Sequence, residues 1–188
     1  MKRIITRINE RLGSCYTAGE VSALTRIIAM ELLGVSQMAY FLKDNITLTA
    51  EQEALLDNAI ERLKKQEPIQ YILGYSDFCD LRFKVTPATL IPRPETSELV
   101  EWITSEATGK ESILDIGTGS GCIAVSLAHK LPQSKVTAWD ISNEALAVAS
   151  ENSKENGQTV TFEQVDILAY EPTGEQFDII VSNPPYIK

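Results

Sequence analysis

The residues best suited to chemistry lie near the end of the chain, where an apolar segment, 177–181, leads into Asn183-Pro184-Pro185-Tyr186. The two prolines donate no backbone hydrogen bonds, so the motif could simply terminate a strand. It could also bind a substrate, because the Asn183 side-chain oxygen and the Pro184 carbonyl can accept both N–H bonds of a planar NH2 group. These contacts would hold a weakly nucleophilic nitrogen and favour the positive charge that develops on it, while Tyr186 offers a stacking face.

A glycine-rich turn, Gly117-Thr118-Gly119-Ser120-Gly121, joins a predicted strand at 112–116 to a predicted helix at 122–130. Glycine lets the backbone turn tightly and approach a ligand without interference from a Cβ atom. The N-terminus of the following helix offers N–H groups to an anion or a carboxylate. The spacing is G-x-G-x-G rather than the G-x-G-x-x-G of dinucleotide-binding proteins, which argues against a nicotinamide-dependent oxidoreductase.

Acidic residues mark the ends of three successive predicted strands. Asp115 lies just ahead of the glycine turn, Asp140 ends the second strand, and Asp166 follows the third. The carboxyl ends of parallel strands line the ligand crevice of an open α/β sheet, so these acids should face one ligand. Asp140 is at the usual place for an acid that binds ribose hydroxyls, and Asp166 could reach an adenine amino group.

The elements that would position these residues fall into two parts. Residues 2–66 have helical periodicity, and capping-box patterns start two helices at Thr17 and Thr49, so a bundle of about four helices is predicted. From Glu111 onward strands alternate with helices, which predicts an α/β fold with a parallel sheet and helices on both faces. The expected segments are a helical domain at 1–74, a hairpin or connector at 75–92, and an α/β domain at 93–188.

Composition argues against several classes of partner. The formal net charge is -9, which disfavours free DNA or RNA because binding to nucleic acid draws on phosphate neutralisation by Lys and Arg. Neither a membrane-spanning apolar stretch nor a signal-peptide pattern is present, so no membrane partner and a cytoplasmic location are expected. The distant cysteines, Cys15, Cys79 and Cys122, predict reduced thiols rather than disulfides, and no metal site.

Three arginines recur every four residues in the first predicted helix: Arg3, Arg7 and Arg11. This spacing places them on one face of the helix, opposite an apolar face. We predict an ordinary solvated face, with a docking stripe for an anionic partner as the alternative.

Taken together, the glycine turn and the ordered acids resemble the S-adenosylmethionine-dependent class I methyltransferases. Within that class, the Asn-Pro-Pro-Tyr loop is similar to the loop of enzymes that methylate planar NH2 groups. The segment 67–102 closely resembles the connector of the release-factor glutamine N5-methyltransferases, the HemK or PrmC family. This likeness includes Pro-Ile-Gln-Tyr, the Phe78–Phe83 spacing and Ile-Pro-Arg-Pro-Glu-Thr at 91–96, and it extends over essentially the whole chain.

The resemblance implies a Rossmann-like methyltransferase domain and a helical domain that docks the substrate, the Gly-Gly-Gln tip of peptide-chain release factors. The implied catalytic residues are Asn183, Pro184 and Tyr186, and Pro185 joins them in holding the glutamine. The residues implied to bind S-adenosylmethionine, and its product S-adenosylhomocysteine, are Gly117, Thr118, Gly119, Ser120, Gly121, Asp140, Asp166, Ile167 and Asn183. Ser97 and Ile167 differ from the residues that are common at these two positions in the family. Neither difference affects the reacting groups. The family's sheet continues through further strands, so the chain is expected to be C-terminally truncated.

Two alternatives remain open. A DNA adenine or rRNA guanine amino-methyltransferase would share the Asn-Pro-Pro-Tyr loop, although the acidic charge and the segment 67–102 argue against it. A binding-only fragment would dock a partner without turnover. Methyl transfer to a release factor, compared with DNA and rRNA, distinguishes them.

Overall fold

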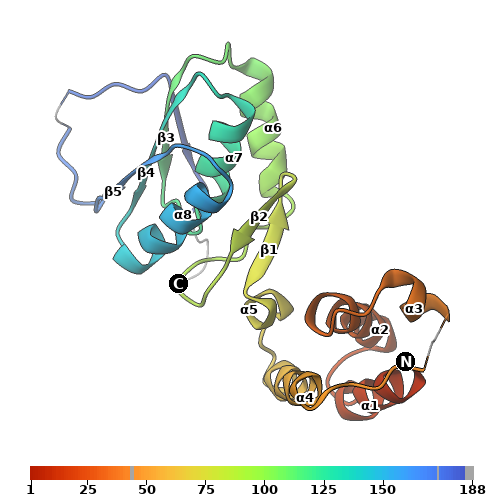
Figure 1. The fold of residues 1–188 in the computed structure, drawn as a ribbon. Coiled ribbons are helices and arrows are strands. Elements are labelled where there is room, and N and C mark those ends of the chain that lie inside the picture. Colours follow the sequence, from red (N-terminus) through yellow and green to blue (C-terminus); the bar gives the residue numbers. More distant parts are fainter. Residues whose placement is uncertain (43–44, 173, 185–188) are drawn as a thin grey trace. The chain divides into compact units, whose positions relative to one another are not determined.

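The fold was analysed in a computed structural model, which describes residues 1–42, 45–172 and 174–184 (Figure 1). The chain divides into two units, Met1–Leu73 and Gly74–Lys188, and each has its own hydrophobic core. Within the described ranges, none of the helices combines the length and the apolar composition that crossing a membrane requires.

The first unit is helical. Its elements are α1 (Lys2–Leu12), α2 (Ala18–Ile27), the π-helical segment η1 (Ile28–Leu32), α3 (Gln37–Leu42), α4 (Ala50–Lys64) and α5 (Ile69–Leu73). Complete capping boxes start α2 and α4, with the Thr17 and Thr49 hydroxyls accepting from the backbone N–H groups of Glu20 and Gln52, as the sequence predicts. Apolar residues at helical spacing, such as Ile8, Leu12 and Leu56, are fully buried between these helices.

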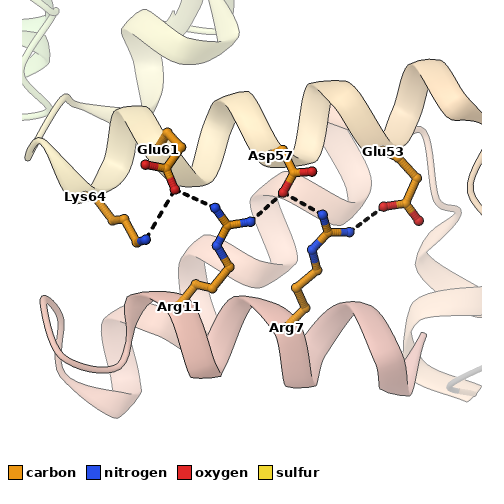
Figure 2. Close-up of polar contacts among 6 residues, drawn as sticks. All are labelled: Arg7, Arg11, Glu53, Asp57, Glu61 and Lys64. Atoms are coloured by element: carbon orange, nitrogen blue, oxygen red, sulfur yellow. Dashed lines mark hydrogen bonds and ion pairs between the residues drawn. The ribbon is translucent and has the colours of Figure 1, made fainter.

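A ladder of ion pairs joins α1 to α4 on the surface of this unit (Figure 2). Arg7 pairs with Glu53 and, at 2.5 Å, with Asp57; Arg11 pairs with Asp57 and Glu61, each at 2.5 Å. Lys64 Nζ lies 3.2 Å from Glu61 Oε1 and ends the ladder. The arginine face is therefore neither simply solvated nor a free stripe for an anionic partner, because two of its three arginines are bound by acids of α4.

The second unit begins with a hairpin and continues as an α/β fold. Its elements are β1 (Tyr75–Phe78), β2 (Leu81–Lys84), α6 (Thr96–Glu106), β3 (Ser112–Ile116), α7 (Cys122–Lys130), β4 (Lys135–Asp140), α8 (Asn143–Glu155), β5 (Thr161–Gln164) and β6 (Ile179–Ser182). The antiparallel strands β1 and β2 are joined by Cys79 and Asp80, both at positive φ. Two consecutive residues at positive φ make the tight turn that matches the twist of a hairpin.

Four parallel strands form the sheet, in the order β5-β4-β3-β6 (Figure 1). Side chains alternate between its two faces, so Val136 and Ala138 of β4 point into the core formed with α6 and α7, whereas Trp139 points to the other face. On that second face, the Trp139 ring lies 4.8 Å from the Tyr170 ring and 6.1 Å from the Phe177 ring. The result is the predicted parallel sheet with flanking helices.

The last strand begins two residues later than predicted, at Ile179 rather than residue 177. Just before it, the Asp178 Oδ2 accepts hydrogen bonds from the Ser112 N–H at 2.8 Å and from the Ser112 hydroxyl at 2.7 Å, and the Asp178 N–H donates to the Ser112 carbonyl at 2.9 Å. Asp178 thus ties the start of β6 to the start of β3. The register then pairs Ile113 with Ile179 and Ile116 with Ser182, which delivers Asn183 to the carboxyl edge of the sheet.

Candidate active site

The carboxyl ends of β3, β4 and β6 form one edge of the sheet. The glycine turn follows β3, Asp140 ends β4, and Asn183 follows β6. A pocket at this edge is lined by residues 117–120, the start of α7, residues 90–93 of the connector, Thr96 and Asn183. The structure therefore brings the two main predicted motifs, the glycine turn and the start of the Asn-Pro-Pro-Tyr loop, to a single pocket.

Two positions of the turn favour glycine, one through a close contact and both through a positive φ. Gly121 has a φ of 78°, and a Cβ atom there would lie 3.0 Å from the Cβ of Ala149, so only glycine lets α7 begin this close to α8. Gly119 has a φ of 56° and open space around the position of a Cβ. Its N–H donates to Asp140 Oδ2 at 2.8 Å, which ties the turn to the end of β4.

The main chain of the turn is also held by β4. The N–H groups of Gly117 and Thr118 both donate to the carbonyl of Trp139, at 2.8 and 3.0 Å, and the N–H of Gly121 donates to the carbonyl of Thr118. These donors are used inside the protein. The turn therefore offers a ligand mainly close access to a rigid backbone, and the first turn of α7 offers further N–H groups.

Asp140 and Asp166 differ in their relation to the pocket. Both Asp140 oxygens accept backbone N–H groups, Oδ2 from Gly119 and Oδ1 from Ser142 at 3.0 Å, and each oxygen keeps a lone pair for a further donor. Asp166 accepts from the N–H of Leu168, and Ile167 is exposed. None of Asp140, Asp166 and Ile167 is among the residues that line the pocket, but Asp140 alone of the three is bonded to a lining residue, Gly119. The structure thus places Asp140 against the turn, whereas an adenine contact by the other two remains a prediction.

An acid behind the turn and a thiol beside it have raised pKa values. Burial raises the pKa of Asp115 to about 6, although the Thr118 hydroxyl donates to its Oδ2 at 2.7 Å and favours the charged form. Cys122 lines the pocket and is partly buried, and desolvation raises the pKa of its thiol to about 12, so it is protonated at neutral pH and is a poor nucleophile. Cys122 is a free cysteine in the structure, as the sequence predicts.

Asn183 is held by a residue that the sequence reasoning did not place in the site. Its Nδ2 donates to the Oγ1 of Thr96, the first residue of α6, at 3.0 Å. Thr96 is buried and belongs to the Ile-Pro-Arg-Pro-Glu-Thr motif, so the family-like motif was the signal that could have found it. Pro184 is exposed, and Pro185 and Tyr186 lie outside the described residues.

Asn152 of α8 is a second residue that sequence reasoning missed. Its Oδ1 accepts from the Lys84 N–H at 2.7 Å, and its Nδ2 donates to the carbonyls of Lys84 at 3.0 Å and Ser120 at 2.8 Å. The side chain is fully buried. One amide therefore links the hairpin, α8 and the glycine turn, and a buried asparagine within a helical pattern was the only sequence signal for it.

Comparison with known proteins identifies the family of the chain. Residues 95–188 match the family model described as Methyltransferase small domain, and residues 4–74 match the PrmC N-terminal domain. A release factor glutamine methyltransferase of Bacteroides thetaiotaomicron is 48% identical over 188 residues, which are 100% of this chain and 68% of the relative. The chain belongs to the release factor glutamine methyltransferase family.

A second member of the release factor glutamine methyltransferase family, from Flavobacterium psychrophilum, is 42% identical over 193 residues, covering 100% of this chain and 68% of its own length. The family member from Lactococcus lactis subsp. lactis is 51% identical over 142 residues, which are 74% of this chain and 52% of that protein. Membership in this family was predicted from the sequence and is confirmed.

Proposed function

We propose that this protein transfers a methyl group from S-adenosylmethionine to the side-chain amide nitrogen, N5, of the glutamine in the Gly-Gly-Gln motif of peptide-chain release factors. The observation that carries this proposal is the position of Asn183. It follows β6 at the carboxyl edge of the sheet, lines the same pocket as the glycine turn, and has its Nδ2 bound to Thr96. The names of the relatives supply the class of substrate.

The residues present suit S-adenosylmethionine. Open space beside Gly117 and Gly119 allows a ligand to approach the backbone, and Asp140 beside them can accept hydrogen bonds from ribose hydroxyls. In this proposal residues 117–121 and Asp140 hold the cofactor, and Asp166 with Ile167 flank the adenine. When bound, the cofactor would supply a methyl group already activated by the sulfonium. The amide nitrogen would give up one proton to water, leaving S-adenosylhomocysteine and the N-methylamide as products.

The chain's own contribution to the reaction is the placement of the amide nitrogen. An amide nitrogen is a weak nucleophile because its lone pair is delocalised. The Asn183 side-chain oxygen and the Pro184 carbonyl accept its two N–H bonds, fix its orientation, and stabilise the positive charge that grows on it. Two prolines in succession keep that carbonyl rigid, and Tyr186 stacks on the planar group.

We further propose that the helical unit, Met1–Leu73, docks the release factor while the α/β unit carries the chemistry. The reaction would take place in the cytoplasm, where translation terminates. A protein substrate suits the formal net charge of -9 better than DNA or rRNA, whose phosphates it would repel.

The test is methyl transfer from labelled S-adenosylmethionine to a purified release factor, measured beside duplex DNA and rRNA. Label is expected in the release factor alone, at the Gly-Gly-Gln peptide. Label in either nucleic acid at a comparable rate would support the alternative amino-methyltransferase, and binding without label would support a binding-only protein.

A release factor whose motif glutamine is replaced by glutamate serves as the matched control substrate. Its carboxylate brings oxygens instead of N–H donors to the acceptors of Asn183 and Pro184, so the expected rate is at background. Methylation of the glutamate variant at a rate similar to that of the glutamine substrate would contradict the amide-clamp mechanism.

A further inference from the structure

The first residue of α6 and the end of β6 meet at the pocket. Thr96 and Asn183 are 87 residues apart in the chain, yet Asn183 Nδ2 donates to Thr96 Oγ1 at 3.0 Å. Thr96 is 8% exposed, so this contact is largely shielded from water. Both side chains line the pocket that contains the glycine turn.

The orientation of an asparagine amide decides what it can bind. One end, Oδ1, accepts hydrogen bonds and the other, Nδ2, donates them, and a half-turn about χ2 exchanges the two ends with almost no change in shape. A substrate amide brings N–H donors, so it needs Oδ1 facing it. The turned orientation would set Nδ2 against the substrate N–H groups and leave donors facing donors.

Thr96 is itself fixed, so it can fix its partner. Its backbone N–H donates to the carbonyl of Arg93 at 3.0 Å, in the turn that begins α6. A threonine side chain is branched at Cβ and has few rotamers, so its hydroxyl stays close to one position. In the structure that hydroxyl accepts from Nδ2, which ties the Asn183 side chain to α6 and leaves Oδ1 as the end not used in this contact. A hydroxyl can also donate, so the contact fixes the place of the side chain rather than choosing between the two ends of its amide.

We propose that Thr96 is a positioning residue that holds the Asn183 side chain at the place required by an amide substrate. The proposal rests on the proposed function. It gives the Ile-Pro-Arg-Pro-Glu-Thr motif a task in the reaction, because the last residue of that motif anchors the group that receives the substrate nitrogen. In this proposal Thr96 acts through Asn183.

The experiment compares three variants of the protein. Thr96→Val keeps the shape of the buried side chain but removes the hydroxyl, and Thr96→Ser keeps the hydroxyl. Thr104→Val makes the same change elsewhere on α6, where the hydroxyl donates to the Glu101 carbonyl within the same helix. For Thr96→Val we expect kcat for the release factor to fall about tenfold, the loss of one oriented hydrogen bond. S-adenosylmethionine affinity and Tm should stay near wild type, and both other variants should retain kcat within about twofold.

An independent readout separates this proposal from the proposed function. In 15N-labelled protein, the two side-chain NH2 resonances of Asn183 should shift in Thr96→Val and stay in place in Thr104→Val, whether or not the release factor is a substrate. Shifted resonances with no wild-type methyl transfer would refute the proposed function alone. Unchanged resonances, an unchanged kcat, or a serine variant as slow as the valine variant would each overturn the role of Thr96.

Discussion

The ion-pair ladder of the helical unit and the pocket of the α/β unit use polar side chains in different ways. In the helical unit, Arg7 and Arg11 reach across to acids of α4 on the surface, where the paired side chains are about one-third to one-half exposed. In the α/β unit, Asn152 and Thr96 are buried and make neutral hydrogen bonds to the glycine turn and to Asn183. Exposed charges are screened and adaptable, whereas buried neutral hydrogen bonds hold one geometry. The geometry of the pocket is therefore held by buried neutral hydrogen bonds.

The comparison is tested most strongly at Asn183. We predict that Asn183→Ala lowers kcat at least about 100-fold, because loss of one preorganised partner of the reacting group typically costs about 3 kcal/mol or more. Affinity for S-adenosylmethionine, measured by calorimetry, should survive. Equal losses of affinity and turnover would indicate a collapsed pocket rather than a lost substrate contact.

Asp115 is a buried acid behind the glycine turn, and its replacement should change the pH dependence of stability. Its pKa is about 6 in the fold, above the value of about 3.8 expected when unfolded, so the folded state holds this proton more tightly. Its contribution to the free energy of unfolding is therefore greatest below about pH 4 and falls as the pH rises to 6, by about 3 kcal/mol in all.

We expect Asp115→Asn to remove this decline and to be the more stable protein at pH 7. The measurement is urea unfolding of both proteins at several pH values between 4 and 7. Profiles that run parallel over this range would show that Asp115 does not titrate there.

Replacement of Asp140 should weaken cofactor binding more than it lowers the stability of the fold. We predict that Asp140→Ala weakens S-adenosylmethionine binding by about 1.5–3 kcal/mol, the usual loss for a charged hydrogen-bond acceptor. Asp140→Asn is the matched control, because it keeps an oxygen for the Gly119 N–H while losing the charge. Calorimetry that finds wild-type affinity in the alanine variant would remove Asp140 from the binding site.

The smallest effect is expected in the ion-pair ladder. Asp57 contacts both Arg7 and Arg11, so Asp57→Asn weakens two pairs at once (Figure 2). Because these pairs are half-exposed, the loss in stability should be no more than about 1 kcal/mol and should shrink at 1 M salt, where the Debye length is about 3 Å. A loss of several kcal/mol that persists in high salt would show that the helical unit also depends on fixed polar geometry.

The parts of the fold that sequence predicts well are those with local causes. The predicted bounds of β3 and α7 match the observed ones residue for residue, because an apolar run, a glycine turn and a helix start punctuate that stretch. Capping boxes at Thr17 and Thr49 act over three residues and were also predicted. The turn and Asn183 meet at one pocket because parallel strands end at the same edge.

The parts that could not be predicted depend on pairs of polar groups far apart in the chain. Thr96 meets Asn183 across 87 residues, and Asn152 meets Lys84 across 68. Such single contacts leave no periodic pattern, and a hydroxyl or an amide suits many surroundings equally well. The partners of Arg7 and Arg11 could not be predicted for the same reason. The spacing places both arginines on one face of α1, but it does not indicate that acids of α4 bind them.

The strand order also has a consequence for how the protein is made. The helical unit, including the pairing of α1 with α4, lies within the first 73 residues, so it can form early in synthesis. By contrast, β6 pairs with β3 across 66 residues, as in the hydrogen bonds between Ser112 and Asp178. The ribosome must release residues up to Ser182 before this pairing is complete. The glycine turn and Asp140 can thus be in place on a nascent chain well before Asn183 arrives, so the amide-binding end of the pocket is assembled last.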